Sequence, residues 1–311
     1  MPRLMLRLTT DCNSGCHHCT VADVPADQTR APREALAELV QARKQGSDEL
    51  VFMRGEPTLR PDLPALAKAA RKVGYRLIQI QTNGRRLCYA PYLDKLLAAG
   101  VDYFEVSLFG ATAATNDAVS VEQGAFEQTL AGLRLLAERG VQSGGRVGTL
   151  VTFAVLRANL HELTAAAELV AELGLSRLQY NFTRPVRVDG AWRREVLARL
   201  DEAGPPLRAA MARARELGLW VSTEAVPLCQ LDPADRGAAE QARDFAEVRV
   251  VDFHQRHESF AQHHRVARPL GPRCPECAVV DRCPTTWRAY QELFGTDELR
   301  PLAEPDADVP S

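Results

Sequence analysis

Long apolar runs and an excess of one charge are missing from this 311-residue chain, and we expect no secretory leader. No apolar stretch approaches the roughly 18 residues that a membrane span needs. The opening MPRLMLRLTTDC holds only a broken apolar stretch without a small-residue cleavage site. Lysine plus arginine (38) nearly balance aspartate plus glutamate (40), for a formal net charge of −2. We therefore expect a cytoplasmic protein with no membrane partner and no bulk charge that favours nucleic acid.

Cysteine is abundant instead, with eight residues in the chain. A reducing compartment disfavours disulfides, so this number indicates metal or redox chemistry. The cysteines fall into an early group, a single residue and a late group: Cys12, Cys16 and Cys19, then Cys88, then Cys229, Cys274, Cys277 and Cys283. We interpret Cys88 as a buried small apolar residue rather than a ligand.

The first two thirds of the chain alternate β-like runs with amphipathic helical stretches, which predicts βαβ units and a parallel sheet. The expected strands are residues 3–9, 49–53, 76–81, 102–109, 146–156 and 176–182. The expected helices are residues 32–45, 64–73, 91–99, 126–139 and 161–173. Six such units predict an α/β fold, a partial (β/α)6 TIM-like barrel, with its chemistry at the carboxyl ends of the strands.

The character of the sequence changes near Pro185, where prolines and glycines punctuate a helical region. A strand-like run follows at 219–226, and the late cysteines come after it. We predict a barrel core over residues 1–184 and a small cysteine-rich C-terminal extension over residues 185–311.

The segment TTDCNSGCHHCT places Cys12, Cys16 and Cys19 at C-x3-C-x2-C directly after the first expected strand. Thiolates are soft ligands that suit iron–sulfur clusters or zinc. A 4Fe–4S cluster held by three cysteines leaves one iron open to a small molecule. The alternative is a structural zinc with His17 or His18 as the fourth ligand, although such sites usually take their ligands from two separated pairs.

This cysteine spacing and three later segments resemble the motifs of the radical S-adenosylmethionine (radical SAM) superfamily. MRGEPTLRPDL, after the second strand, resembles the Gly-Gly-Glu-Pro segment that binds the methionine end of the cofactor, with Arg54 in place of the first glycine. QTNGRR and SLFGATAATND, after the third and fourth strands, resemble the Thr-Asn-Gly and Ser-Leu-x-Gly segments of the family. The resemblance covers about residues 3–184.

The resemblance implies that Cys12, Cys16 and Cys19 hold a 4Fe–4S cluster whose open iron chelates S-adenosylmethionine. It also implies cofactor contacts from His18, Gly55, Glu56, Pro57, Thr82, Asn83, Ser107 and Thr152. The residues themselves agree in part, because a strand-end glycine lets the backbone approach a ligand and a carboxylate can pair with the cofactor's ammonium group. His18 stands where the family commonly has an aromatic residue near the adenine, and Asn83 with Gly84 can equally be an ordinary turn.

The late cysteines form C-x2-C-x5-C at Cys274, Cys277 and Cys283, with Cys229 as a distant fourth ligand. Spacing alone fits either a structural zinc or a fully ligated 4Fe–4S cluster. The segment resembles twitch and SPASM-type extensions, which favours one auxiliary 4Fe–4S cluster. We interpret the histidine-rich FHQRHESFAQHH, with His257 and His264, as a solvated or substrate-facing loop rather than a metal site.

The resemblance implies reductive cleavage of S-adenosylmethionine to a 5′-deoxyadenosyl radical, which abstracts hydrogen from the substrate. Analogy with twitch and SPASM relatives favours a ribosomally made peptide or a small natural-product precursor, with flavodoxin or ferredoxin as electron donor. A sulfur-insertion enzyme, whose auxiliary cluster donates sulfide, and a non-catalytic zinc-binding protein are the alternatives. No peptide-recognition or cobalamin-binding domain fits before Arg3, so we do not expect a large leader-bound or cobalamin-dependent member of the family.

Overall fold

One sheet of nine strands organises the described part of the computed structural model, residues 2–21, 28–141, 148–188, 190–240, 247–253, 256–257 and 260–303. Its order is β11-β10-β1-β2-β3-β4-β5-β6-β9, and every neighbouring pair is parallel except β10 with β11. The strands are β1 (Arg3–Arg7), β2 (Glu49–Met53), β3 (Leu77–Thr82), β4 (Tyr103–Leu108), β5 (Gly148–Val155), β6 (Arg177–Phe182), β9 (Trp220–Glu224), β10 (Val248–Val251) and β11 (Arg256–His257).

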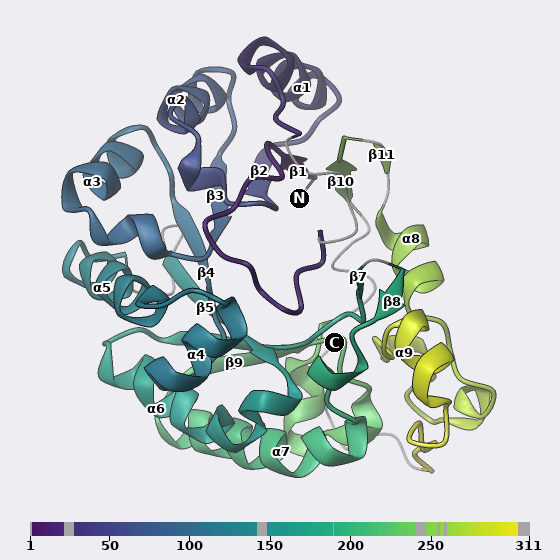
Figure 1. Cartoon of the computed structure of the whole chain (residues 1–311). Helices are drawn as coiled ribbons and strands as arrows, with labels where there is room; N and C mark the ends of the chain where they lie inside the picture. Colours follow the sequence, from purple (N-terminus) through teal and green to yellow (C-terminus); the bar gives the residue numbers. More distant parts are fainter. Residues whose placement is uncertain are drawn as a thin grey trace.

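Helices surround the outside of the curved sheet, and the strands lie at the centre (Figure 1). The main outer helices are α1 (Pro32–Lys44), α2 (Leu63–Lys72), α3 (Ala90–Ala98), α5 (Ala125–Glu138), α6 (Leu163–Glu172) and α7 (Leu200–Glu216). No helix in the described residues combines the length and apolarity of a membrane span. This arrangement confirms the predicted α/β partial barrel.

The two faces of the strands meet different surroundings. Ile80 of β3 and Val106 of β4 are 0% exposed and belong to the apolar core that also contains Leu133 of the outer helix α5. Successive residues of a strand point to opposite faces. Gln79 and Glu105, which directly precede Ile80 and Val106, therefore point to the other face, where Gln79 donates a 2.6 Å hydrogen bond to Glu105. The outer face of the sheet therefore packs against the helices in the hydrophobic core, whereas the inner face is polar.

Residues beyond Pro185 extend the same sheet at both edges. β9 pairs with β6, and β10 pairs with β1. The strand-like run at 219–226 predicted β9, whereas β10 and β11 were not predicted. The division at residues 184 and 185 stays a proposal: it marks a change in sequence character, while both parts contribute strands to one sheet.

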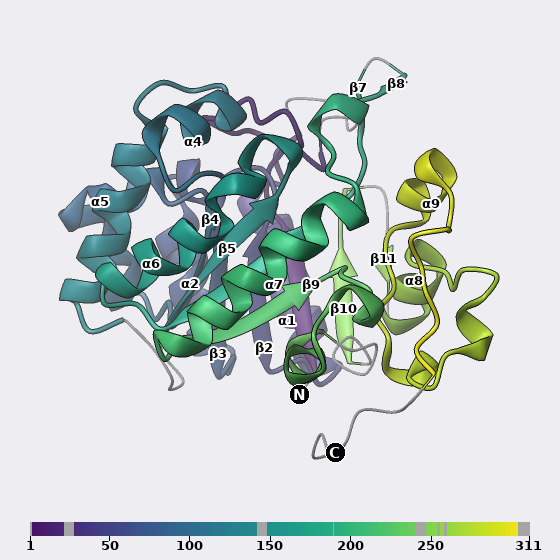
Figure 2. The same ribbon diagram turned by 90° about the horizontal axis from the view of Figure 1, so that it is seen from below.

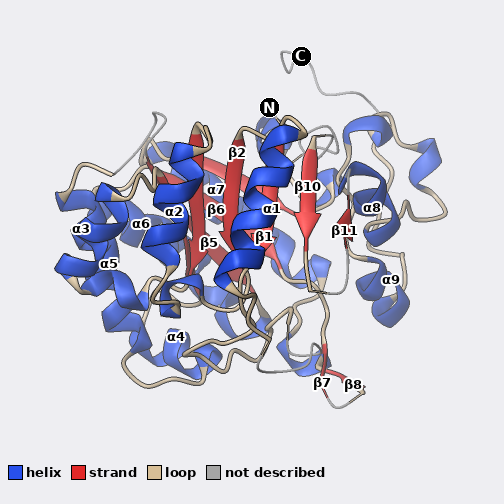
Figure 3. Ribbon diagram, turned by 90° about the horizontal axis from the view of Figure 1, so that it is seen from above, coloured by secondary structure: helices blue, strands red, loops and turns tan. Residues whose placement is uncertain are grey.

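The C-terminal segment forms a lobe beside β10 and β11 that contains α8 (Phe260–Ala267) and α9 (Arg288–Phe294) (Figures 2 and 3). The indole of Trp287 donates a 2.7 Å hydrogen bond to the Phe182 carbonyl at the end of β6. Arg268 stacks 4.0 Å from the Trp287 ring centroid and pairs with Glu224 of β9 at 2.9 Å. These contacts fix the lobe against the ends of β6 and β9. β7 (Arg187–Val188) and β8 (Ala191–Trp192) form a separate short antiparallel hairpin.

Candidate active site and cysteine centres

The three early cysteines lie on the loop that leaves the carboxyl end of β1, and none forms a disulfide. Burial, followed by the nearby Cys12 and Cys19 thiols, raises the pKa of Cys16 to about 12. Burial and the Glu56 carboxylate raise the pKa of Cys12 to about 11. Without a metal, the Cys12 and Cys16 thiols of this group of three stay protonated. A bound cationic metal centre would lower their pKa values and favour the thiolate forms that act as ligands. The donor set therefore fits an iron–sulfur cluster.

The loop is fixed by α4 (Ala113–Ser120), a short helix that follows β4. The Gly15 amide donates to the Ser120 carbonyl at 2.9 Å, and the His17 amide donates to the Val119 carbonyl at 3.2 Å. Both carbonyls belong to the last turn of the helix, where backbone acceptors have no partner within the helix. The end of α4 therefore holds the cysteine loop through main-chain contacts.

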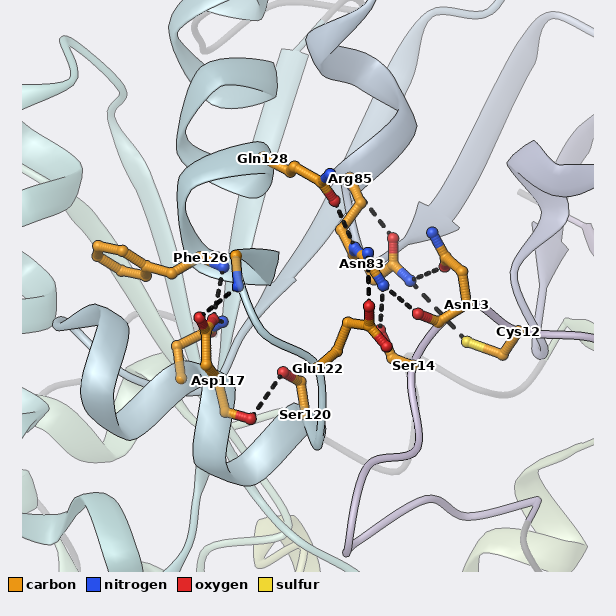
Figure 4. Close-up of polar contacts among 12 residues, drawn as sticks. Cys12, Asn13, Ser14, Asn83, Arg85, Asp117, Ser120, Glu122, Phe126 and Gln128 are labelled. Carbon is orange, nitrogen blue, oxygen red and sulfur yellow. Dashed lines mark hydrogen bonds and ion pairs between the residues drawn. The ribbon is translucent and has the colours of Figure 1, made fainter.

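Arg85, in the short helix η2 (Arg85–Cys88) after β3, holds the same loop from the other side (Figure 4). Its Nη1 donates to the Asn13 carbonyl and, at 3.4 Å, to the Ser14 hydroxyl. Its Nε donates to Gln128 Oε1 at 2.7 Å, and its Nη2 pairs with Glu122 at 3.3 Å. Arg85 was not among the residues predicted from the sequence, although its place directly after Thr-Asn-Gly was the available signal.

Glu56, Thr82 and Asn83 are brought together at the ends of β2 and β3. The Glu56 carboxylate accepts hydrogen bonds from the Thr82 hydroxyl and the Asn83 amide, both at 2.7 Å, and from Thr58 at 2.6 Å. The Asn83 side chain donates to Asn13 Oδ1 at 2.7 Å and lies 3.9 Å from Cys12 Sγ. Glu56 is only 1% exposed, and burial raises its pKa. Glu56 therefore connects the ends of β2 and β3 through hydrogen bonds. Its contact with a cofactor ammonium group stays a prediction.

Gly55 permits a close backbone approach, but the segment that approaches it is the start of the cysteine loop rather than a ligand. Its φ is +58°, and a Cβ there would lie 2.4 Å from the Thr9 carbonyl oxygen and 2.8 Å from that of Asp11. The next amide, of Glu56, donates to the Asp11 carbonyl at 2.7 Å. Pro57 then begins a buried turn. The Gly-Glu-Pro segment thus packs directly against the start of the cysteine loop.

Ser107 and Thr152 lie opposite each other on β4 and β5. Both alternate into the inner face with Glu105, whose carboxylate accepts from the Thr152 hydroxyl at 3.4 Å and from Gln81 at 3.0 Å. Enclosure by the barrel raises the pKa of Glu105. Glu105 was not predicted either, and a charged residue at an inward strand position was its signal.

His18 packs edge-on against Phe109 with ring centroids 4.7 Å apart. Burial, followed by the charge of His17, lowers the pKa of His18 to about 4, so the ring is neutral at pH 7. Its Nδ1 is buried without a hydrogen-bond partner in the described residues. The predicted contact with the adenine stays a prediction.

The four late cysteines line one pocket. Cys229 follows β9, whereas Cys274, Cys277 and Cys283 come from the C-terminal lobe. The structure thus brings together all four members of the predicted ligand set, across a long separation in sequence. Apolar side chains such as Leu228, Leu270 and Val280 complete the lining.

The chemistry of this pocket fits a fully ligated cluster. Burial, followed by the Cys283 and Cys274 thiols, raises the pKa of Cys229 to about 11. Main-chain amides of Gly271 and Leu302 donate to the sulfurs of Cys274 and Cys277 at 3.2 and 3.4 Å. Such donors stabilise thiolates and tune cluster potentials.

The remaining predictions about cysteine and histidine need two corrections. Cys88 lies apart in η2 and is half-buried rather than buried. The solvated-loop interpretation is wrong for His264, which is 1% exposed because α8 packs against β10. The side chain of His257 lies outside the described residues. Within them, no three His, Cys, Asp or Glu side chains stand at the spacing of a single-ion site.

Comparison with known proteins matches residues 6–170, more than half of the chain, to the Radical SAM superfamily. "AdoMet-dependent heme synthase" of Methanosarcina barkeri is 36% identical over 177 residues, which are 56% of this chain and 48% of that protein. The chain thus spans about half the length of the curated relatives it matches.

Among solved structures, native anSMEcpe with bound AdoMet has a TM-score of 0.67 at 14% identity, over 92% of this chain and 89% of its own. Streptococcus suis SuiB, bound to precursor peptide SuiA, has a TM-score of 0.59 at 16% identity, over 71% and 48%. These structures share the fold. The radical SAM family uses a 4Fe–4S cluster with S-adenosylmethionine, and the loop of Cys12, Cys16 and Cys19 fits that centre. With its matched barrel and its twitch- or SPASM-like extension, this chain belongs to the radical SAM superfamily.

Proposed function

We propose that the chain is a radical SAM enzyme that acts on a peptide or a small natural-product precursor. Cys12, Cys16 and Cys19 would hold the SAM-binding cluster, and Cys229, Cys274, Cys277 and Cys283 an auxiliary 4Fe–4S cluster. When bound, cluster and cofactor supply the 5′-deoxyadenosyl radical that takes hydrogen from the substrate. The observation that carries the proposal is the group of three thiols on a loop fixed at the carboxyl ends of the barrel strands.

The surrounding residues have separate parts in this proposal. The cofactor contacts would come from His18, Gly55, Glu56, Pro57, Thr82, Asn83, Ser107 and Thr152. Asn83 and Arg85 orient the cysteine loop, because they bind its backbone and side chains directly. A site that is positioned before its ligand arrives loses less free energy on binding.

The substrate class rests on the structural neighbours. SuiB was solved with a precursor peptide, which supports a peptide substrate for a chain of the same fold. The name of the 36% identical relative supports a tetrapyrrole as the second candidate. A flavodoxin or ferredoxin as reductant, and a cytoplasmic location, belong to the same proposal.

The decisive experiment is anaerobic reconstitution with iron and sulfide, followed by dithionite and S-adenosylmethionine. We expect the wild type to form 5′-deoxyadenosine, and a Cys12→Ala, Cys16→Ala, Cys19→Ala variant to form none. Cys88→Ala is the matched control, because Cys88 lies apart from both thiol groups, and it should keep wild-type turnover. An intact first cluster in the wild type without 5′-deoxyadenosine would refute enzyme function.

Sulfur insertion is distinguished by the auxiliary centre. A sulfur donor loses sulfide during turnover, so its sulfide content falls in step with product. An unchanged sulfide content after several turnovers excludes that alternative.

A further inference from the structure

Arg54 has an unusual backbone conformation at the end of β2. Its φ is +63°, in the left-handed region that residues with a side chain rarely adopt and that glycine adopts readily. The Gly-Gly-Glu-Pro segment that this stretch resembles has glycine at the same place. An arginine that persists in such a conformation invites a functional explanation.

Two further guanidinium groups lie near Arg54. Arg7 of β1 is opposite Met53, the residue directly before Arg54, and is 2% exposed. Arg184 follows β6, and its Nη2 donates a 2.9 Å hydrogen bond to the carbonyl of Thr20, next to Cys19. Burial, and then the charges of Arg7 and Arg184, lower the pKa of Arg54 to about 10. The three groups thus repel one another at the end of the barrel that holds the cysteine loop.

Asp252 and Cys19 act against this repulsion at Arg54, but the acidic side chains of the described residues balance the positive charge only in part. Asp252 pairs with Arg7 at 2.7 Å, but no described acidic side chain forms an ion pair with Arg54 or Arg184. Arg184 Nε is also buried without a hydrogen-bond partner in that part of the chain. Arg54 and Arg184 are partly buried, and partly buried cations without a counter-charge are unfavourable, whereas a bound anion would satisfy both the charge and the open donor.

We infer that Arg54 and Arg184 bind an anionic group of the substrate, a carboxylate or a phosphate, beside Cys19, while Arg7 adds to the local positive charge. Guanidinium groups match both anions through paired N–H donors. The inference deepens the proposed function and rests on it, since it places the substrate at the same strand ends. It narrows the substrate class to an organic acid, a phosphate ester or a peptide with an acidic side chain.

The test measures anion binding by the reconstituted protein saturated with S-adenosylmethionine, by calorimetric titration and thermal shift. The probes are inorganic pyrophosphate and propane-1,2,3-tricarboxylate, each against sodium chloride at equal ionic strength. We expect the wild type to bind at least one probe with a dissociation constant in the millimolar range or below. Preference for pyrophosphate identifies a phosphate ligand, and preference for the tricarboxylate identifies a carboxylate.

Arg54→Gly is the informative variant, because glycine relieves the positive φ and the protein should fold at least as stably as the wild type. We expect its affinity for the preferred probe to fall at least tenfold. Arg184→Gln should lose a similar factor. Arg134→Gln, on the exposed face of α5, is the control and should bind like the wild type.

Three results would overturn the inference: no response of the wild type to either probe, equal affinity in Arg54→Gly, or a loss confined to S-adenosylmethionine affinity or cluster potential. The proposed function is judged separately, by 5′-deoxyadenosine from the wild type. Cleavage without anion binding overturns only this inference, whereas anion binding through Arg54 without cleavage overturns only the proposed function.

Discussion

Single side chains decide how firmly the cysteine loop is held, and Arg85 contributes two contacts to it. Arg85→Ala removes donors to Asn13, Ser14 and Gln128 together with the pair to Glu122. Hydrogen bonds from a charged group contribute about 1.5–3 kcal/mol each at most, and they are not additive. We expect slower cluster incorporation and a reduction potential more negative by tens of millivolts, since a nearby positive charge is lost.

Two comparison variants make this measurable by redox titration of the first cluster. Arg85→Lys keeps the charge but loses the forked geometry, so the potential should recover while cluster incorporation stays slow. Arg86→Ala is the matched control, because Arg86 binds the Thr58 carbonyl and the Tyr92 ring instead. A potential unchanged in Arg85→Ala would contradict the assignment.

Gly55→Ala tests the close approach of the second strand end to the loop. The added methyl group would lie 2.4 Å from a backbone oxygen that cannot move aside easily, in a conformation that disfavours any side chain. We expect a loss of roughly 2 kcal/mol or more in the free energy of unfolding, together with poor iron incorporation. Gly46→Ala is the control, because Gly46 also has a positive φ but an added Cβ there meets no atom within 4 Å. In a denaturant titration, the difference between the two variants gives the cost of the steric clash apart from the cost of the backbone conformation.

At this scale the sequence predicted what is local. The spacing of Cys12, Cys16 and Cys19 is visible within eight residues, so the motif identified them. Arg85, Glu105 and the neighbours of Arg54 acquire meaning only when separate strands come together. For the same reason the Glu56 carboxylate, expected to face a ligand, could not be recognised in advance as a brace for Thr82 and Asn83.

Among the elements, α4 links the cysteine loop to the rest of the barrel, and Glu162 secures its first turn. The Glu162 carboxylate accepts from the Ala111 amide and from the Thr112 and Thr115 hydroxyls, each at 2.7 Å. Burial works to raise the pKa of Glu162, but the hydrogen bonds from Thr115, Thr112 and Ala111 outweigh it and place the pKa below the ordinary value.

Glu162→Gln should therefore lower the free energy of unfolding by about 1–2 kcal/mol at pH 7. Because the folded-state pKa lies below that of the unfolded chain, the stabilisation is present above about pH 4.5 and is lost as the pH falls through the folded-state value. Urea titrations of both proteins between pH 7 and pH 3.5 check this. A difference that persists at the acid end would contradict it.

Element boundaries were predicted well where the chain carries clear start and stop signals. α1 begins at Pro32 and ends before Gly46, as its proline and glycine indicate, and β2 spans the predicted residues 49–53. α4 was missed because AATNDAVS has little apolar periodicity. β10 was missed because a four-residue strand is defined by its partner β1 rather than by its own composition.

For the whole molecule, the auxiliary centre joins the segment after β9 to the C-terminal lobe. We expect about eight iron atoms per chain in the wild type and about four in a Cys274→Ala, Cys277→Ala, Cys283→Ala variant, since one of two 4Fe–4S clusters is lost. The variant should also unfold at a lower temperature, because a metal centre closes a long loop. One zinc ion per chain in the wild type, together with the same iron content in wild type and variant, would identify a zinc site at the late cysteines instead.

The pairing of β1 with β10 also has a consequence during synthesis of the chain, because β10 is made long after β1. Arg3 lies opposite Val248 in the sheet, so one edge of the first strand has no partner until residue 248 has been made. At roughly 5–20 residues per second, that wait lasts on the order of 10–50 seconds. During this time β1 presents open main-chain donors and acceptors along that edge, which is the kind of edge that can pair with another chain.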